Sequence, residues 1–427
     1  MKSDRRTGRA ADDRRARQAG CAGSAGQRDR AAVAPPAAVA HDCRVPAFSL
    51  YVHIPYCDSK CPYCDFNSYA VKRWPEREYC DALMAEMRAY AALPSWRDRP
   101  IHSIFFGGGT PSLFDPDTIA TLLECAAGLW PRQAAHLERT LEANPGTVSV
   151  SKLRDFRTAG VNRMSFGVQS FQPHLLERLG RIHDAAAAID AVRAAREAGF
   201  DEVNLDLMFA VPGQTVQEWD ADLATAVALR PTHISAYNLT YEDDTAFTAW
   251  RRSGALVPVP EEAEVAMFAR VRTLLPAHGY AQYEISNYAA AGHECAHNLN
   301  YWRAGDYLGI GAGAHSYLRD GEHGRRWGNE KIPGRYLERM RKDRQARASE
   351  ETLSPEQARG EFVFLGLRCR DGIEGATFER RFGLDLVRAF PHLEVFMRDG
   401  RLEHVDGRWR LTERGLLFAD SIFATFV

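Results

Sequence analysis

The chain has 427 residues, of which 45% are hydrophobic, and a formal net charge of -2. That length and composition allow a large core in two or three domains, and no apolar run approaches the roughly 18 to 20 residues that a membrane helix needs. The near-neutral charge gives no reason to expect a nucleic-acid partner, and nine unevenly placed cysteines favour a reducing compartment and metal chemistry over a disulfide framework.

The first segment, residues 1–47, differs in composition from the rest of the chain. It is rich in Ala, Arg and Gly and carries ten Lys or Arg against five Asp. Such a composition cannot bury enough apolar surface to fold, so we expect a disordered tail. Five Asp residues are unusual for a transit peptide, and the segment lacks the apolar region of a secretory signal. We expect it to be a dispensable tail, or to result from a start codon that is placed too far upstream.

From residue 48 to residue 290, short apolar runs alternate with longer Ala-rich stretches of helical period. The expected strands are 49–54, 103–106, 139–143, 163–167, 203–211 and 233–239. Asp115, Ser151, Asp184 and Thr215 resemble helix caps between them. Six such βαβ repeats predict an α/β fold, a partial, open TIM-like barrel whose chemistry lies at the carboxyl ends of the strands.

Residues 291–427 are expected to form a C-terminal mixed α/β domain. Its end is predicted to contain two helices, a hairpin over 401–411 that turns at Asp406-Gly407, and a final helix, which together resemble a small winged-helix unit. From residue 376 onward this part carries eight Arg against eight Asp or Glu, without the basic surplus that DNA binding requires. We therefore expect it to pack on the barrel as a cap.

Three cysteines, Cys57, Cys61 and Cys64, follow the first expected strand with the spacing C-x3-C-x2-C. Three thiolates on one loop can bind three irons of a [4Fe-4S] cluster and leave the fourth iron without a protein ligand. A structural zinc site is the alternative, but it requires four ligands and no second Cys/His pair at finger spacing follows. Cys80 and Cys125 stand alone in helical segments and are expected to be small core residues.

Further motifs follow the later strands. They are Gly107-Gly108-Gly109-Thr110-Pro111, Gly167-Val168-Gln169-Ser170, Asp206-Leu207-Met208 and Pro212-Gly213-Gln214-Thr215, besides Tyr51-x-His53-Ile54-Pro55-x-Cys57. Together with the cysteine loop they resemble the HemN-type radical S-adenosylmethionine (SAM) family from about residue 49 to the C-terminus. The resemblance implies that SAM contacts Tyr51, Gly108, Gly109, Thr110, Glu142, Gln169, Arg181 and Asp206.

Two branches of that family differ at one position after the cluster. The oxygen-independent coproporphyrinogen III oxidases carry a further Cys two residues after the third, where this chain has Phe66. The chain is more similar to the haem chaperone branch, HemW.

By the same resemblance, the segment His297-Asn298-x-x-Tyr301-Trp302 is expected to bind haem, with His293, Cys295 or His315 as alternative iron ligands. The small residues from Gly309 to Gly313 leave room for a flat ligand or for a neighbouring backbone.

The resemblance implies a haem chaperone that holds a [4Fe-4S] cluster and SAM and delivers haem to haem-requiring proteins such as respiratory enzymes. Such a protein is expected to be cytoplasmic and to reach the inner face of the membrane only through its partners, and SAM cleavage would require an electron donor. The alternative is an enzyme, a coproporphyrinogen III oxidase that decarboxylates the substrate propionates. A third possibility is a structural zinc or scaffold protein.

Overall fold

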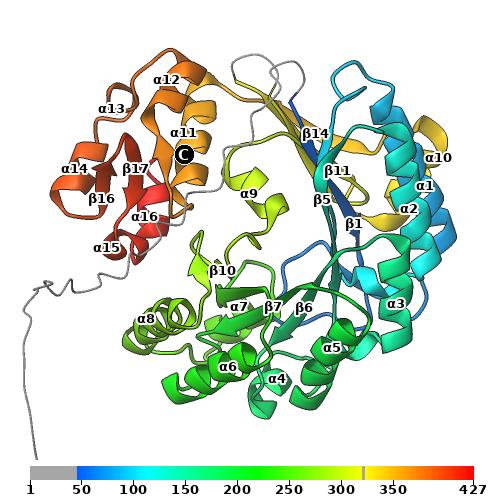
Figure 1. The fold of residues 1–427 in the computed structure, drawn as a ribbon, viewed down its shortest axis with the longest axis horizontal. Coiled ribbons are helices and arrows are strands. Elements are labelled where there is room, and N and C mark those ends of the chain that lie inside the picture. The colour runs from blue at the N-terminus through cyan, green and yellow to red at the C-terminus, as the bar shows by residue number, and fades with distance from the viewer. Residues whose placement is uncertain (1–45, 320–322) are drawn as a thin grey trace, which may run out of the picture. The chain divides into compact units, whose positions relative to one another are not determined.

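The computed structural model describes residues 46–319 and 323–427, so nearly all of the expected tail, residues 1–47, lies outside the described residues. Six parallel strands follow one another across the main sheet (Figure 1). They are β1 (Phe48–Ile54), β4 (Ile101–Gly108), β5 (Gln133–Ala143), β6 (Arg163–Gln169), β7 (Glu202–Phe209) and β8 (His233–Asn238). All six lie where the apolar runs predicted strands, which confirms the partial barrel.

Helices between these strands cover the outer face of the sheet (Figure 1). They are α1 (Glu76–Ala91), α2 (Pro116–Leu129), α3 (Val150–Ala159), α4 (Pro173–Arg178), α5 (Ala185–Glu197) and α6 (Val216–Ala228), with short 3₁₀ turns at Pro111–Leu113 and Pro145–Thr147. Two more helices, α7 (Ala246–Arg252) and α8 (Glu261–Ala277), follow β8, and α8 packs against α6. Asp184 caps α5, and Thr215 forms a capping box with Glu218 at α6, as predicted. The cap of α3 is Ser149 and not Ser151, and the Asp115 side chain makes no cap hydrogen bond.

The sheet continues beyond residue 290, across the expected domain boundary. Strand β11 (Tyr307–Ile310) pairs in parallel with β1, and β12 (His315–Leu318), β13 (Arg325–Asn329) and β14 (Arg347–Thr352) follow it in antiparallel order. At the other edge, β10 (Asn287–Ala289) and β9 (Ala281–Gln282) pair beyond β8. The division at residues 290 and 291 stays a prediction, and residues 307–352 are part of the same sheet as the barrel.

The turns between β11 and β13 are anchored on α1 by the carboxylate of Glu86. It accepts hydrogen bonds from the Gly311 amide (2.9 Å), the Asn329 side chain (2.7 Å) and the Tyr336 hydroxyl (2.8 Å) at the start of α10 (Pro333–Asp343). Glu86 is 2% exposed, and this burial raises its pKa to about 7 against the opposing hydrogen bonds. A buried Arg99–Asp306 ion pair (2.5 Å) fixes the chain just before β11.

The C-terminal part has a hydrophobic core of its own. Its helices are α11 (Pro355–Leu367), α12 (Gly375–Phe382), α13 (Leu386–Ala389), α14 (Leu393–Arg398), α15 (Glu413–Leu416) and α16 (Ala419–Phe423), and its sheet has the order β15 (Ile373–Glu374), β17 (Arg408–Leu411), β16 (Leu402–Val405). The predicted hairpin turns at Asp406 (φ 52°) and Gly407 (φ 75°), as a type I′ turn requires. This arrangement bears out the winged-helix-like unit.

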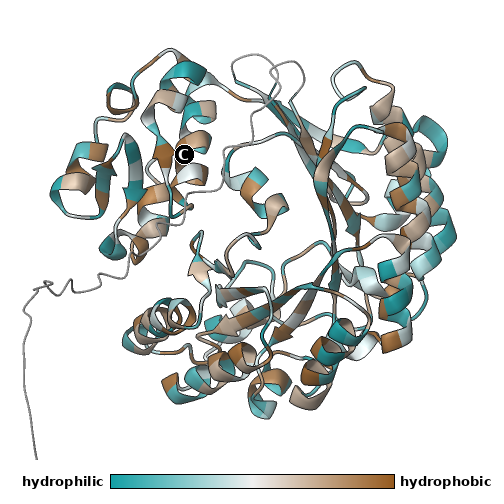
Figure 2. Ribbon diagram, in the orientation of Figure 1, coloured by the Kyte–Doolittle hydropathy of each residue, from teal (hydrophilic) through white to brown (hydrophobic). Residues whose placement is uncertain are grey.

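This unit contacts the rest of the fold through residues just after α11. The Arg370 amide donates to the Tyr283 carbonyl (2.9 Å), and the Arg368 guanidinium lies 4.4 Å from the Trp302 ring centroid and 3.8 Å from the fully buried Glu284 carboxylate. Figure 2 shows apolar residues along the strands of the main sheet, while the outer helices alternate apolar and polar residues. Over residues 46–319 and 323–427, no helix combines the length and the apolar character needed to cross a bilayer.

Candidate functional site

The cysteine loop leaves the carboxyl end of β1 and returns to a two-residue strand. Cys57 ends β2 (Tyr56–Cys57), which pairs with β3 (Tyr69–Ala70), so the loop is closed at its base. Each sulfur has its own polar neighbour: the Thr110 hydroxyl donates to Cys57 Sγ (3.6 Å), Arg181 Nη1 donates to Cys61 Sγ (3.4 Å), and the Ser68 hydroxyl lies 3.9 Å from Cys64 Sγ. Burial raises the pKa of the Cys57 thiol, and the hydrogen bonds from the Thr110 and Ser68 hydroxyls oppose this rise.

The glycine segment at the end of β4 lies directly against this loop. The Gly109 amide donates to the Ile54 carbonyl (2.8 Å) and the Thr110 amide to the Tyr56 carbonyl (2.8 Å). A Cβ at position 109 would lie 2.5 Å from the Tyr56 carbonyl oxygen, and Gly108 has φ +112°, so glycine is required at both positions. The segment therefore fixes the backbone that precedes Cys57.

Arg181 joins the cysteine loop to β5 and β6. Its Nη2 donates to the Gly167 carbonyl (2.7 Å) and to the Asn144 side-chain oxygen, and Asn144 in turn donates to the Thr110 hydroxyl (3.0 Å). The Nε atom of Arg181 is buried without a hydrogen-bond partner among the described residues. A buried cation with a free donor is suited to an anionic group such as the SAM carboxylate.

These residues surround one cavity of about 440 Å³ at the carboxyl ends of the strands. It is lined by all three cysteines and by seven of the predicted SAM contacts: Gly108, Gly109, Thr110, Glu142, Gln169, Arg181 and Asp206. Tyr51, the eighth, lies outside this cavity and donates its hydroxyl group toward the His53 ring (3.0 Å). Gln169 adopts φ 68° at a β-bulge between β6 and β7, a strained backbone that turns its side chain at the site.

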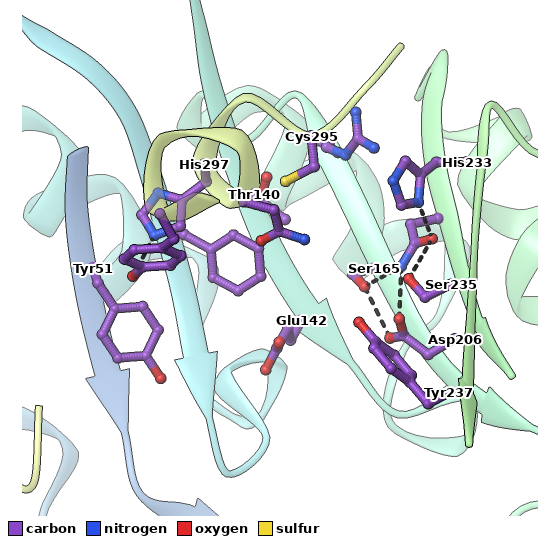
Figure 3. A pocket seen from close by; sticks show the side chains of 15 residues that line it. Tyr51, Thr140, Glu142, Ser165, Asp206, His233, Ser235, Tyr237, Cys295 and His297 are labelled. Atoms are coloured by element: carbon purple, nitrogen blue, oxygen red, sulfur yellow. Dashed lines mark hydrogen bonds between the residues drawn. The ribbon is translucent and has the colours of Figure 1, made fainter. Parts of the chain in front are cut away.

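Two carboxylates, Glu142 and Asp206, line both this cavity and a smaller one inside the barrel, whose lining residues Figure 3 shows. Burial and then the Asp206 charge raise the pKa of Glu142 to about 8, although the Gly108 amide donates to it at 3.3 Å. Burial also raises the pKa of Asp206, against hydrogen bonds from Ser165 (3.0 Å) and Asn204 (2.8 Å). Such acceptors can bind hydroxyl groups of a ribose or the cationic part of a ligand.

A second cavity, of about 180 Å³, lies deeper in the concave face of the sheet, next to helix α9 (Ala296–Trp302) (Figure 3). His297 is 1% exposed there. Its Nδ1 lies 2.9 Å from the Ser103 hydroxyl and its Nε2 2.9 Å from the Tyr301 hydroxyl. Burial, and to a lesser extent the charge of His102, lowers its pKa to about 3. In this conformation neither ring nitrogen of His297 is free to bind an iron.

The other residues predicted to contact haem are divided between two places. Asn298 lines the inner cavity, Trp302 lines an open groove beside the cluster loop, and Tyr301 lines both. Cys295 is buried, and burial raises the pKa of its thiol, which donates to Glu138 (3.4 Å). These residues therefore do not converge on one surface, and their role in haem binding stays a prediction.

Sequence reasoning missed several residues that build the site. Glu138 on β5 accepts from the amides of Ala296 (3.1 Å) and His297 (3.1 Å) and so holds the start of α9. Tyr237 and Leu239 line the cluster cavity, as does Met208 of the motif Asp206-Leu207-Met208. The signal that could have found Tyr237 and Leu239 is their position near the carboxyl end of β8.

The sulfur donors at this cavity are the three cysteine thiols of one loop. In the part of the chain that the structure describes, no three Cys, His, Asp or Glu side chains converge on a position that one ion could occupy. A cubane cluster binds each thiolate through a different iron, so its ligands need not converge. Three cysteines around a cavity with polar neighbours fit a [4Fe-4S] cluster with SAM beside it.

Comparison with known proteins agrees with this geometry. The model of the Radical SAM superfamily matches residues 51–226, and the model of the HemN C-terminal domain matches residues 353–418. Heme chaperone HemW of Haemophilus influenzae is 40% identical over 391 residues, 90% of this chain and 99% of that protein. Heme chaperone HemW of Escherichia coli is 40% identical over 395 residues, and that of Bacillus subtilis is 37% identical over 381. The chain belongs to the HemW family.

The fold of this chain is similar to that of a solved structure. Coproporphyrinogen III oxidase (HemN) from Escherichia coli, described as a radical SAM enzyme, superposes with a TM-score of 0.77 at 24% identity and covers 90% of each chain. At that identity the similarity shows the fold alone. This chain therefore shares the fold of that structure over 90% of its length, and its cysteine cavity lies at the carboxyl ends of the barrel strands.

Proposed function

We propose that this protein is a haem chaperone, which binds haem and transfers it to haem-requiring proteins such as respiratory enzymes. The observation that carries the proposal is similarity at 37 to 40% identity, over about nine-tenths of the chain, to proteins named Heme chaperone HemW. Phe66 supports it, since this position, 63% exposed beside the cluster cavity, holds no fourth cysteine.

The cofactors of the proposal are a [4Fe-4S] cluster and SAM. Cys57, Cys61 and Cys64 would each bind one iron, and the cavity beside them has room for SAM. When bound, this pair supplies one-electron chemistry. Arg181 offers a cation for the SAM carboxylate, and Glu142 offers an acceptor for its ribose hydroxyls.

The partners follow from the cargo. Haem is the substrate of the transfer, and the acceptors are proteins that require it. If SAM is cleaved, an electron donor is also needed. We place the protein in the cytoplasm, from where it would reach the inner face of the membrane through its acceptors.

The alternative function, a coproporphyrinogen III oxidase, is supported only by the fold that the chain shares with HemN. Anaerobically reconstituted protein separates the two. We expect the wild type to take up haem and pass it to an apo-acceptor, read from the haem absorbance of each protein after separation, and to form no protoporphyrinogen from coproporphyrinogen under reduction. Protoporphyrinogen formation without haem transfer would overturn the chaperone proposal.

The cluster is tested by replacing one ligand. Cys61→Ala should leave the protein without stable iron and sulfide after reconstitution. Cys125→Ala is the matched control, because Cys125 is a partly buried cysteine in α2, away from the cluster cavity. Equal iron content in the two variants would show that the triad does not bind the cluster.

A further inference from the structure

An open groove of about 790 Å³ lies beside the cluster cavity, and nothing considered so far occupies it. Its volume is within the range of small-molecule and cofactor sites. Aromatic side chains line it, among them Phe66, Tyr69, Trp302 and Tyr307. A groove with several aromatic walls suits a large, flat, apolar ligand.

Two histidines line the groove, and they differ in their hydrogen bonds. His53 has partners on both ring nitrogens, the Tyr51 hydroxyl (3.0 Å) and the Asn67 carbonyl (2.9 Å). His315, the exposed first residue of β12, makes no side-chain hydrogen bond within residues 46–319 and 323–427. Its imidazole is therefore the one available to bind a metal from the groove.

The His315 ring lies over a glycine on the neighbouring strand. His315 pairs with Gly328 on β13, and a Cβ at position 328 would lie 3.0 Å from Cε1 and 3.2 Å from Nδ1 of the ring. The ring thus rests against bare backbone. Partial burial, then the charges of Lys331 and Arg326, lower the pKa of His315.

The groove also offers a cation. Lys331 lines it, and its ammonium group forms no ion pair with any residue that the structure describes. Arg326, the other cation near His315, is paired with Glu351 (2.8 Å) and Glu361 (2.5 Å). Lys331 is therefore the charge available to a ligand carboxylate.

Two acidic residues, Asp65 and Glu142, line both the groove and the cluster cavity. Burial raises the pKa of Glu142 to about 8, so its carboxyl group is neutral near pH 7 and only Asp65 places a charge on this shared wall. An anionic ligand group is therefore attracted toward Lys331 rather than toward Asp65.

We propose that haem binds in this groove with its iron bound to the His315 imidazole, its ring against Phe66, and a propionate beside Lys331. The inference rests on the proposed chaperone function and names the site of its cargo. In this site His315, and not the buried His297, is the iron ligand, and Trp302 forms part of the wall of the groove.

The site would be connected to the cluster loop by a short segment. The Asn67 side chain donates to the carbonyls of Ala312 (3.0 Å) and Lys331 (2.9 Å), and the Tyr69 hydroxyl donates to Asn67 (3.1 Å). Residues 65–69 thus follow the last cluster cysteine and form one wall of the groove. Haem bound there would contact the loop that holds the cofactor.

The test titrates haem into full-length, cluster-loaded protein under anaerobic conditions and follows the Soret band. We expect His315→Ala to weaken haem binding at least tenfold and to change the spectrum, and added imidazole to restore the wild-type spectrum. Lys331→Glu should weaken binding several-fold without moving the band, because it leaves the iron ligand intact. His278→Ala, at the exposed end of α8, is the matched control and should bind as the wild type does.

Separate readouts keep the test decisive. Iron content, SAM binding and circular dichroism establish that each variant is folded, and His315→Gln replaces His315→Ala if the alanine variant is not. Wild-type affinity and spectrum in a folded His315 variant, with loss in His297→Ala, would overturn this site and leave the chaperone function standing. A wild type that takes up no haem would overturn both.

Discussion

Replacing Gly109 with alanine would place a methyl group 2.5 Å from the carbonyl oxygen and 2.8 Å from the amide nitrogen of Tyr56. Ordinary contacts of this kind begin at 3.4 Å, so the two backbones must separate by roughly 0.9 Å. Overpacking of a core costs about 1–3 kcal/mol. The Gly109–Ile54 and Thr110–Tyr56 hydrogen bonds, both 2.8 Å, cross the same contact, and weakening them adds about 1 kcal/mol each.

The expected loss for Gly109→Ala is therefore about 3–5 kcal/mol, or roughly 4 to 6 °C in melting temperature for a folded chain of this size. Since Tyr56 precedes Cys57, iron content after reconstitution should fall as well. Gly128→Ala is the control: no atom lies within 4 Å of its Cβ, and an exposed helical glycine gains about 0.5–1 kcal/mol as alanine. Circular dichroism during heating and iron analysis measure both effects. Equal melting temperature and iron content in the two variants would refute the steric reasoning.

Three further outcomes are expected. In the folded state the Glu86 carboxyl group keeps its proton up to about pH 7, whereas in the unfolded chain it loses the proton near pH 4.5, so the free energy of unfolding falls as pH rises through this window. Glu86→Gln should reduce that fall by about 3 kcal/mol, measured by urea titrations at several pH values. The same dependence of stability on pH in wild type and variant would contradict the assignment. Asp306→Ala leaves the buried Arg99 guanidinium without its carboxylate partner and should lower the free energy of unfolding by about 3 kcal/mol, measured by urea titration. A loss below about 1 kcal/mol would mean that the backbone carbonyls around Arg99 are enough to stabilise its charge. Arg181→Gln should weaken SAM binding at least tenfold by calorimetry while the protein stays folded, and wild-type affinity would remove Arg181 from the SAM site.

The barrel strands could be predicted because each is a local apolar run bounded by a turn or a polar loop. The cysteine loop and Gly107–Gly109 could be placed because the carboxyl ends of parallel strands meet at one edge. The resemblance named Arg181 as a SAM contact, but its contact with Cys61, 120 residues away, was not predicted, since no local pattern contains it.

The environment of His297 could not be read from its neighbours in sequence. Its burial depends on Ser103 and Glu138, which lie 194 and 159 residues away. The glycines after residue 308 allowed either a flat ligand or a neighbouring backbone, and the structure shows the second: a Cβ at Gly311 would lie 2.4 Å from the His53 carbonyl oxygen. Side-chain exposure is a property of tertiary packing, so a motif alone could not separate His297 from His315.

The pairing of β1 with β11 has a consequence for biosynthesis. Tyr307 must emerge from the ribosome before Ser49 acquires its second neighbour, and Lys331 must follow before Asn67 finds its acceptor. Domains otherwise tend to fold in the order of translation, from the N-terminus. Here β1, the first strand to be translated, gains its second neighbour, β11, only after more than 300 residues have been made. We therefore expect iron and sulfide to enter the cysteine loop after most of the chain has been translated.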